Sequence, residues 1–525
     1  MTDEKKLIFV TGGVLSSLGK GLLASSICHI LRNSGLNAYC MKIDPYLNVD
    51  AGTLNPHEHG EVFVTLDGHE GDLDLGNYER FSETNSVREQ NLMMGEVYFS
   101  VLSKERKGVF LGKTVQLIPH VTNEIKERIE TALEKTKAEI LVLELGGTVG
   151  DIESELVLDA ARQMKYEGIH SCIFIHLALV PVIITGEEKT KPMQHSVKTL
   201  LSKGIVPDFI IARSSKPLGI KSKEKIGLMC SVPKDFIFSS YDLPNVYLLP
   251  SVLKEQGFND KLFKKLGYSN LEFNDSWADL LSQKLGKKVK IAVVGKYSAS
   301  GKDAYMSVFE ALKHSGYNLN VDVSADLLDS ETLDINSLKD YDGILVPGGF
   351  GSRGVEGMIK AINYARINNK PFLGICYGMQ LAVIEAARSL GLKNANSTEI
   401  DESTPYPVID LLPEQKDVTQ KGGSMRLGGK KILLKDNTVF MDLYDSKEIT
   451  KRFRHRFEIN PDFTNQLSKL LVFSSTDETG KINKSIELQD KSHPFFIGVQ
   501  FHPEFDSRLT NPEPLFFNFI KAASK

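Results

Sequence analysis

The chain has 525 residues, which is long enough for two or three domains. Its 41% hydrophobic and 25% charged residues are ordinary globular usage, and the formal net charge of -4 gives no sign of nucleic-acid binding. The five cysteines are an odd number without a CxxC pair, so they indicate neither a disulfide framework nor a zinc ribbon. Since no apolar run approaches the roughly 20 residues needed to cross a bilayer, and the charged start runs straight into a strand, we expect a soluble cytoplasmic protein.

The first half of the chain alternates short β-rich runs with helical stretches. This alternation is typical of an α/β fold with a parallel sheet. The predicted strands cover residues 7–11, 38–43, 139–145, 172–177 and 208–212.

The run IFVTGGVLSSLGKG predicts a phosphate-binding loop between a buried strand and a helix, with Lys20 placed to reach terminal phosphates. A regular GxxxxGK[ST] motif would have glycine in place of Val14 and serine or threonine in place of Gly21. Because the hydroxyl ligand for Mg²⁺ is missing, carboxylates elsewhere must hold the metal, and Asp74 and Glu144 suit that role. The alternative interpretation is a glycine-rich turn without a nucleotide.

Two further polar runs predict an anionic substrate. Lys189, Lys191 and Gln194 gather in GEEKTKPMQHS, and Lys42 lies in MKIDPYLNVD. Both runs follow sheet strands, where open α/β sheets bind ligands. The alternative is that these lysines only form a solvated face.

Three histidines of the first half could suggest a transition-metal site. His57, His59 and His69 lie in polar, loop-like sequence, without a cysteine or carboxylate at a convincing ligand spacing. We therefore do not predict metal ligation by them.

A polar stretch at 268–288, which holds the only tryptophan, Trp277, is interpreted as an interdomain linker. It divides the chain into a first domain of residues 1–267 and a second of residues 289–525. The second begins with a strand at 290–295.

The second half then continues as another α/β unit. A helix is expected from about Ala304, a strand at 343–346, and a mobile loop at 413–431 because that segment is rich in Gly, Lys and Gln.

The run GICYGMQ places Cys376 between an apolar strand, 371–375, and a helix. Small neighbours such as Gly378 allow the strained strand-to-helix turn that exposes a sulfur at a helix N-terminus, where the dipole favours thiolate. Downstream, His502 would take the thiol proton and deliver it to departing ammonia, and Glu504 would hold the imidazole tautomer.

In VPGGFG, Gly348 and Gly349 follow another apolar strand, so a backbone N–H can approach the oxyanion of a thioester-forming step. The alternative is a buried structural cysteine and an unrelated histidine. With the cysteine turn and the HPE run in this order, the region from 289 to 525 resembles the class I glutamine amidotransferases.

The whole chain then resembles CTP synthase. The motifs that carry this resemblance occur in the family's order: TGGVLSSLGKG, MKIDPYLNVD, HGEVFVTLDG, DLDLGNYERF, LELGGTVGDIES, GEEKTKPMQHS, VPGGFGSRGVEG, GICYGMQ, NANSTE, RHRFEIN and QFHPEF.

The resemblance implies that ATP phosphorylates the 4-oxygen of UTP, that ammonia from glutamine attacks C4, and that phosphate leaves to give CTP. It implies Mg²⁺ as cofactor, an internal ammonia passage, GTP activation through GSRGVEG and GGSMRLGG, feedback inhibition by CTP, and a homotetramer that sometimes forms filaments.

The resemblance also assigns residues, motif by motif. Lys42 is expected near the transferred phosphate and Asp74 and Glu144 on Mg²⁺. For ATP the matching positions are Ser17, Leu18, Gly19, Lys20, Gly21, Leu22 and Asp74. For UTP and CTP they are Ser16, Asp151, Ile152, Glu153, Lys189, Thr190, Lys191, Pro192, Met193, Gln194 and Lys225. For glutamine they are Gly349, Tyr377, Gly378, Met379, Gln380, Glu399 and Arg456, around Cys376, His502 and Glu504.

The sequence leaves two other functions as alternatives. One is a different glutamine-dependent ligase that amidates a carboxylate, against which the GEEKTKPMQHS run and DIES argue. The other is a P-loop ATPase that polymerises and carries a decayed glutaminase, against which the intact Cys376, His502 and Glu504 argue.

Overall fold

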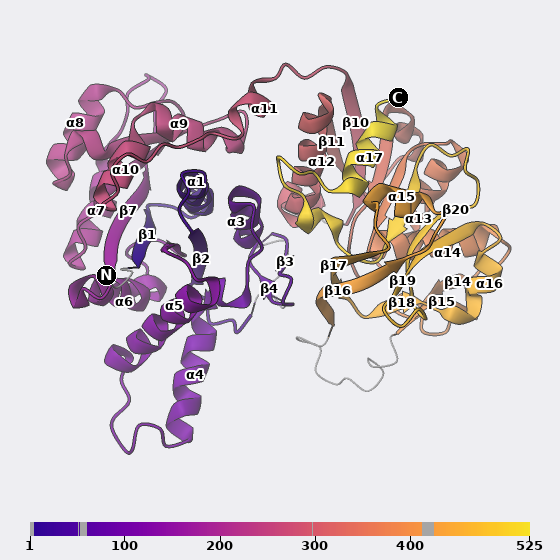
Figure 1. The fold of residues 1–525 in the computed structure, drawn as a ribbon, viewed down its shortest axis with the longest axis horizontal. Coiled ribbons are helices and arrows are strands. Elements are labelled where there is room, and N and C mark those ends of the chain that lie inside the picture. Colours follow the sequence, from indigo (N-terminus) through magenta and orange to yellow (C-terminus); the bar gives the residue numbers. More distant parts are fainter. Residues whose placement is uncertain (1–4, 51, 53–59, 297, 412–424) are drawn as a thin grey trace. The chain divides into compact units, whose positions relative to one another are not determined.

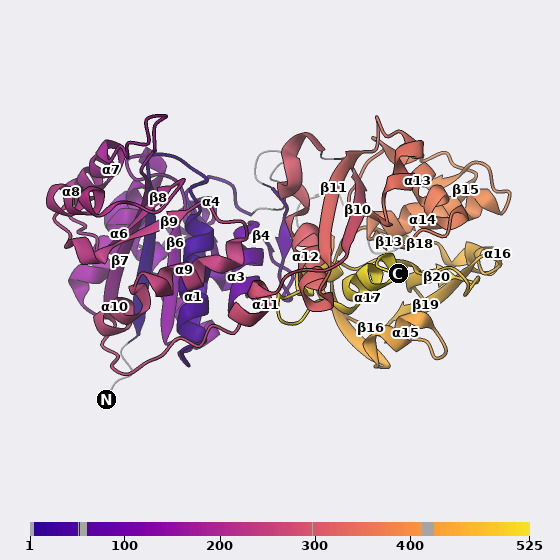
Figure 2. The ribbon, with the colours of Figure 1, turned by 90° about the horizontal axis from the view of Figure 1, so that it is seen from above.

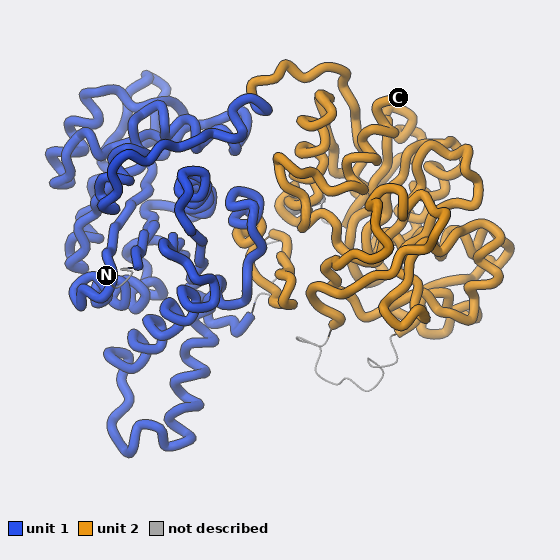
Figure 3. Tube along the Cα trace, in the orientation of Figure 1, with its two compact units in different colours: residues 1–51, 77–281 blue, residues 52–76, 282–525 orange. Residues whose placement is uncertain are grey.

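The structure is a computed structural model and describes residues 5–50, 52, 60–296, 298–411 and 425–525. It divides into two compact units, which Figure 3 shows in different colours. Unit 1 consists of Met1–Ala51 and Asn77–Leu281, and unit 2 of Gly52–Gly76 and Ser282–Lys525. The division at residue 281 falls inside the predicted linker, whereas the assignment of residues 52–76 to unit 2 has no counterpart in the predicted boundaries.

Unit 1 is built on one sheet of seven strands, which pair in parallel in the order β5-β2-β6-β1-β7-β8-β9. This confirms the parallel sheet that the alternating pattern predicted, and each of the five predicted strands is present. The strands are β1 (Lys6–Gly13), β2 (Ala38–Asp44), β5 (Asn91–Met93), β6 (Ile140–Leu145), β7 (Ser171–Leu179), β8 (Phe209–Ser214) and β9 (Ile237–Tyr241).

Helices cover both faces of this sheet, which explains why its strands are apolar on each side. Leu7 and Phe9 of β1 face a core formed with α4, α5 and α6, while α1 packs on β1, β2 and β6 from the other face (Figure 1). The helices are α1 (Lys20–Arg32), α3 (Asp74–Ser82), α4 (Met94–Arg106), α5 (Thr122–Thr136), α6 (Glu155–Glu167), α7 (Lys191–Ser202), α8 (Ile220–Cys230), α9 (Leu249–Glu255), α10 (Phe258–Lys265) and α11 (Ala278–Ser282).

Trp277, in the predicted linker, is fully buried within unit 1. Its ring stacks on His29 of α1 at a centroid distance of 3.6 Å and meets Phe81 and Tyr247 edge-on. The stretch that precedes α11 is therefore fastened to unit 1 by aromatic packing.

Unit 2 has a sheet of nine strands in the order β11-β10-β12-β13-β21-β20-β19-β16-β17, in which the strands from β11 to β21 pair in parallel and the others antiparallel. A three-stranded sheet, β14-β15-β18, lies beside it. The strands are β10 (Lys288–Gly295), β11 (Asp322–Asp329), β12 (Gly343–Val346), β13 (Phe372–Ile375), β14 (Ala395–Ser397), β15 (Tyr406–Leu411), β16 (Arg426–Leu434), β17 (Glu448–His455), β18 (Phe457–Ile459), β19 (Leu471–Asp477), β20 (Asn483–Leu488) and β21 (Phe496–Val499).

The two faces of this sheet have separate cores, and Figure 2 shows the helices that cover them. Helices α12 and α17 pack on one face, and α13 and α14 on the other. The helices are α12 (Met306–Leu319), α13 (Val355–Ile367), α14 (Tyr377–Ser389), α15 (Val439–Tyr444), α16 (Thr464–Leu467) and α17 (Pro514–Ala523).

The loop predicted at 413–431 is wrong at its C-terminal end, because Arg426–Leu434 form β16, which pairs with β17 and β19. Tertiary pairing overrides the weak strand propensity of the glycines and lysines in this run. Residues 412–424 lie outside the described residues.

A hairpin of β3 (Phe63–Val64) and β4 (Glu70–Gly71) joins unit 2 although it comes from the first seventy-odd positions of the chain. Arg452 donates to Val64 O at 3.0 Å, and Arg454 Nε lies 2.7 Å from Glu70 Oε1. Gly428 permits the close approach, since a β-carbon there would fall 2.6 Å from the Cα of Gly68. The hairpin therefore rests directly on β16 and β17.

Within the part of the chain that the structure describes, no helix has the length and apolarity needed to span a membrane.

Candidate active sites

Cys376 lies at the turn between β13 and α14 with φ 50 and ψ -100. A non-glycine residue rarely takes such a conformation, and the packing round it holds the strain. Gly378 allows the helix to begin against β12, because a β-carbon on it would fall 2.0 Å from Val346 O. The structure thus has the strained strand-to-helix turn that the pattern predicted.

His502 and Glu504 lie beside this turn, after β21. Glu504 Oε1 is 2.7 Å from His502 Nδ1, so the carboxylate holds the proton on that ring nitrogen and leaves Nε2 to face the sulfur side. Burial alone would lower the pKa of His502, but the Glu504 carboxylate and the Cys376 sulfur together raise it to about 10. Its Nε2 is buried and has no hydrogen-bond partner among the described residues. The imidazole is therefore held ready to take and keep a proton.

Gly348 separates the two reacting side chains. A β-carbon at this position would fall 2.9 Å from His502 Cε1 and 3.8 Å from Cys376 Cβ. Only glycine leaves the imidazole in place while keeping the backbone after β12 close to the sulfur. The role of this backbone as an oxyanion donor stays a prediction.

The loop that contains Gly348 and Gly349 is held by Lys296, which directly follows β10. Lys296 Nζ donates to Phe350 O at 2.8 Å and Gly351 O at 2.6 Å, and it lies 4.3 Å from the centre of the Tyr377 ring. Burial lowers the pKa of Lys296 to about 8, although Glu399 opposes that shift.

Glu399 and Arg456 approach the same loop. Glu399 Oε1 accepts from Gly351 N at 2.7 Å, and Tyr377 Oη donates to Gly351 O at 2.5 Å. Burial raises the pKa of Glu399, while the Gly351 N–H, Lys296 and Arg456 act against it. Tyr377 and Glu399 thus meet at Gly351, and Arg456 lies close enough to Glu399 to act on its pKa; their glutamine-binding role stays a prediction.

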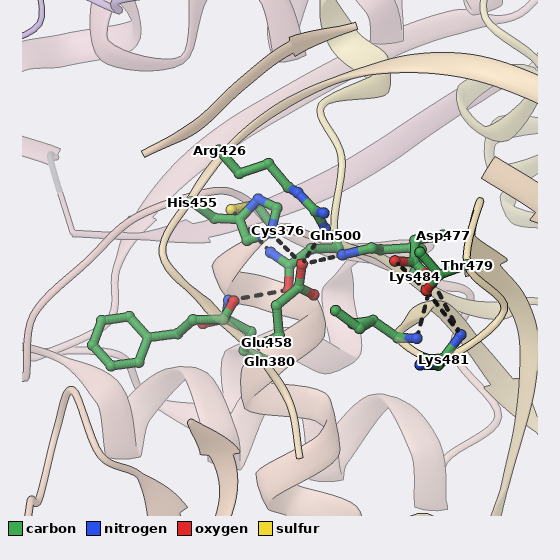
Figure 4. Close-up of polar contacts among 12 residues, drawn as sticks. Cys376, Gln380, Arg426, His455, Glu458, Asp477, Thr479, Lys481, Lys484 and Gln500 are labelled. Atoms are coloured by element: carbon green, nitrogen blue, oxygen red, sulfur yellow. Dashed lines mark hydrogen bonds and ion pairs between the residues drawn. The ribbon is translucent and has the colours of Figure 1, made fainter. Parts of the chain in front are cut away.

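Two residues of this site were not predicted, Lys296 and Gln500. Lys296 follows a buried strand, which is a weak signal, and Gln500 stands inside the quoted QFHPEF motif without a role assigned to it. Gln500 is fully buried, and its Nε2 lies 3.5 Å from Cys376 Sγ (Figure 4).

A buried set of charges lies next to Gln380 and Gln500 (Figure 4). The Glu458 carboxylate binds His455 Nε2 at 2.6 Å, Arg426 at 3.3 Å and Lys484. Burial would raise the pKa of Glu458, but His455 and Lys484 bring it down to about 2.

In unit 1, the predicted phosphate loop follows β1, with Val14, Ser17 and Gly19 at positive φ. Lys20 begins α1, and its Nζ donates to Gly147 O at 2.8 Å. Gly12 permits this fold-back, since a β-carbon there would fall 2.6 Å from Lys20 Cδ. The loop and the turn after β6 therefore meet at the carboxyl ends of neighbouring strands, where such sheets bind ligands.

Lys42 and Glu144 face each other across β2 and β6 as register partners. Their Nζ and Oε1 atoms are 2.9 Å apart, Asp44 lies 3.8 Å from the same Nζ, and Tyr78 donates to the other Glu144 oxygen. Glu144 is only 2% exposed, so its charge depends on these partners.

The donor chemistry of Glu144 fits Mg²⁺, which takes carboxylate oxygens together with phosphate oxygens and waters. Glu144 lies beside the turn that Lys20 contacts, where phosphates would be bound. Asp74, the second predicted ligand, begins α3, and the boundary between the units, after Gly76, falls inside this helix. Among the described residues, no cluster of three His, Cys, Asp or Glu side chains is arranged to hold a metal. His57 and His59 lie outside them, and His69 N donates to Thr65 Oγ1 at 3.0 Å.

The remaining predicted nucleotide residues lie mostly on the surface of unit 1. Lys189 is exposed and pairs with Glu187 at 2.6 Å, and Lys225 is exposed on α8, whereas Gln194 is buried. The exposed ones also include Ser16, Ser17, Asp151, Ile152, Glu153 and Lys191, and the covered ones Gly21, Thr190 and Met193.

Two family models match the chain. The family described as glutamine amidotransferase class-I matches residues 301–522, and the family described as CTP synthase N-terminus matches residues 6–268. The fold and the cysteine site thus define a protein with a class I glutamine amidotransferase domain joined to a second α/β domain.

Relatives match along the whole chain. A CTP synthase of Sulfolobus acidocaldarius is 51% identical over 531 residues, which cover 99% of this chain and 99% of the relative. One of Methanosarcina acetivorans is 48% identical over 530 residues, covering 99% and 98%. The solved glutaminase domain of a Trypanosoma brucei CTPS with bound acivicin is 36% identical with a TM-score of 0.42, and the match covers 45% of this chain and 93% of that one. The chain belongs to the CTP synthase family.

Proposed function

We propose that the chain converts UTP to CTP with ATP and with ammonia released from L-glutamine. The observation that carries the proposal is the strained Cys376 turn with His502 and Glu504 2.7 Å apart beside it, in a chain of this family. The competing scaffold with a decayed glutaminase does not account for a site in which the nucleophile, the base and its carboxylate are all in place.

In unit 2, His502 takes the thiol proton and Cys376 attacks the amide carbon of glutamine. The oxyanion that forms is stabilised by backbone N–H groups of the Gly348 and Gly349 loop. His502 then gives its proton to the departing amide nitrogen, so ammonia leaves and a thioester remains. Water hydrolyses the thioester and releases glutamate. Glu399 and Arg456 would bind the charged α-amino and α-carboxylate groups of glutamine.

In unit 1, ATP transfers its terminal phosphoryl group to the 4-oxygen of the uracil ring. Ammonia then attacks C4, a proton is lost, and inorganic phosphate leaves, giving CTP and ADP. Lys20 and the loop of β1 bind phosphates, and Lys42 offers a compact positive charge where negative charge builds up. Mg²⁺, held by Glu144 and Asp74, would neutralise phosphate charge when bound.

Further parts of the proposal rest on the family resemblance. They are the ATP and UTP contacts of the residues named above, GTP activation through 351–357 and 422–429, feedback inhibition by CTP, a homotetramer with filaments as a further assembly, and a cytoplasmic location. Residues 422–424 of the second GTP segment lie outside the described residues.

The test follows formation of CTP from UTP, ATP and Mg²⁺, with glutamine or ammonium as nitrogen source. We expect the intact chain to use both, and Cys376→Ala to use only ammonium. Cys172→Ala is the matched control, because it removes a partly buried thiol on β7, and it should keep both activities. The proposal is wrong if neither nitrogen source yields CTP with the intact chain.

A further inference from the structure

Gln500 makes a chain of side-chain amides with Gln380 that ends at the sulfur of Cys376. Gln380 Nε2 donates to Phe457 O at 2.9 Å and to Gln500 Oε1 at 3.1 Å, and Gln500 Nε2 lies 3.5 Å from Cys376 Sγ (Figure 4). Both glutamine side chains are buried, at 3% and 0% exposure. Water therefore offers these amides no alternative partners.

The carbonyl of Phe457 fixes the orientation of the whole chain of amides. A backbone carbonyl can only accept, so the Gln380 atom that faces it must be the NH₂ group. The second hydrogen of that NH₂ then points at Gln500, so the atom of Gln500 that faces it must be the oxygen. Consequently the NH₂ of Gln500 faces the sulfur. Its backbone N–H also donates to Lys484 O at 2.9 Å, which fixes the start of the side chain.

The sulfur has two polar contacts of opposite effect among the described residues. As a thiol, Cys376 donates to Arg454 O at 3.7 Å, a bond that exists only while the proton is present. The N–H of Gln500 is a donor to sulfur in both states, and a hydrogen bond to an ionised acceptor is stronger than one to a neutral acceptor. Gln500 thus favours the deprotonated sulfur once His502 has taken the proton.

We propose that Gln500 is a further catalytic residue of the glutaminase site, which holds the Cys376 thiolate through an N–H···S hydrogen bond and is oriented by Gln380. The proposal rests on the proposed function, in which Cys376 is the nucleophile. The charged and titratable groups near the pair are His502, which interacts with the Cys376 sulfur, its partner Glu504, and Glu458 with its partners His455, Lys484 and Arg426.

The test measures the pH profile of Cys376 alkylation by iodoacetamide on the full chain, without glutamine or nucleotides. Mass spectrometry of the Cys376 peptide separates this reaction from that of the other four cysteines. Gln500→Met keeps the shape and removes the donor. We expect its profile to move to higher pH, with alkylation near neutral pH slowed roughly tenfold. Gln500→Glu places a carboxylate against the sulfur and should move the profile further.

Gln380→Glu is a second variant in which Gln500 itself is intact. It takes away the NH₂ that orients Gln500, so the Gln500 amide turns and its oxygen faces the sulfur. The profile should move in the same direction. Gln489→Met is the matched control, because Gln489 is exposed and donates to Ser468 O at 3.0 Å, so its profile should match the intact chain.

If the profiles of Gln500→Met and Gln380→Glu superimpose on that of the intact chain, Gln500 only packs against the cysteine and the proposal is overturned. Thermal unfolding of each variant shows whether unit 2 is folded, and ammonium-dependent CTP formation shows that unit 1 is. Failure of the proposed function would look different, because the intact chain itself would then hydrolyse no glutamine.

Discussion

Gly348 lies against His502 so closely that a β-carbon on residue 348 would fall 2.9 Å from the imidazole Cε1. The base and the nucleophile of the cysteine site are thus positioned by the absence of a side chain on a third residue.

We therefore expect Gly348→Ala to lower the glutamine-dependent rate by about 100-fold, because displacing the imidazole by about 1 Å spoils the geometry of proton transfer. Ammonium-dependent CTP formation should remain. Gly349→Ala is the comparison, since a β-carbon there would make only an ordinary contact at 3.6 Å with Tyr377. A loss in Gly348→Ala no larger than in Gly349→Ala would contradict this explanation.

Changing the pair of Lys42 and Glu144 should have the opposite effect on the two activities: CTP formation is lost and glutamine hydrolysis is kept. Lys42→Met removes the cation 2.9 Å from a carboxylate that is 2% exposed. We expect CTP formation to stop with both nitrogen sources, while glutamine hydrolysis continues at unit 2. Breaking a buried ion pair also destabilises unit 1 by about 3–5 kcal/mol, so thermal unfolding is measured alongside. Lys42→Arg, which keeps the charge, should restore the stability more than the activity; equal recovery of both would argue for a purely structural role.

Glu458 should make unit 2 sensitive to acid. Its pKa is lowered to about 2, so the stability it contributes is present above its ordinary pKa of 4.5 and is lost as the pH falls through about 2. This contribution to the free energy of unfolding is about 3 kcal/mol. Glu458→Gln should unfold more readily than the intact chain at pH 6, and the difference in denaturant midpoint should shrink steadily below pH 4. A difference that stays constant down to pH 2 would rule out this linkage.

His502 should make the stability of unit 2 depend on pH in the alkaline range. Because its pKa is raised to about 10, its contribution to stability is fully present below its ordinary pKa of 6.5 and is lost as the pH rises through about 10. Glu504→Gln removes the carboxylate that holds the imidazolium. The intact chain should therefore exceed this variant in unfolding midpoint most clearly near pH 6, with the two converging toward pH 10. Midpoints that diverge with rising pH would give the linkage the wrong sign.

The sequence alone indicated much of the fold and of the chemistry, because both depend on local patterns. Alternating apolar runs predicted the parallel sheet of unit 1, and strand residues followed by small residues predicted the turns at Cys376 and at the loop before Lys20. These features are set by backbone conformation and by residues close together in the chain. The same local motifs carried the resemblance to the family.

Tertiary structure alone decided the rest. The hairpin of residues 63–71 belongs to unit 2 because glycines 68 and 428, far apart in the chain, pack against each other. Lys296 and Gln500 became site residues only when folding brought them to Tyr377 and Cys376. Which amide atom of Gln500 faces the sulfur depends in turn on the carbonyl of Phe457. Such neighbours follow from long-range packing and from the satisfaction of buried polar groups, which no local pattern contains.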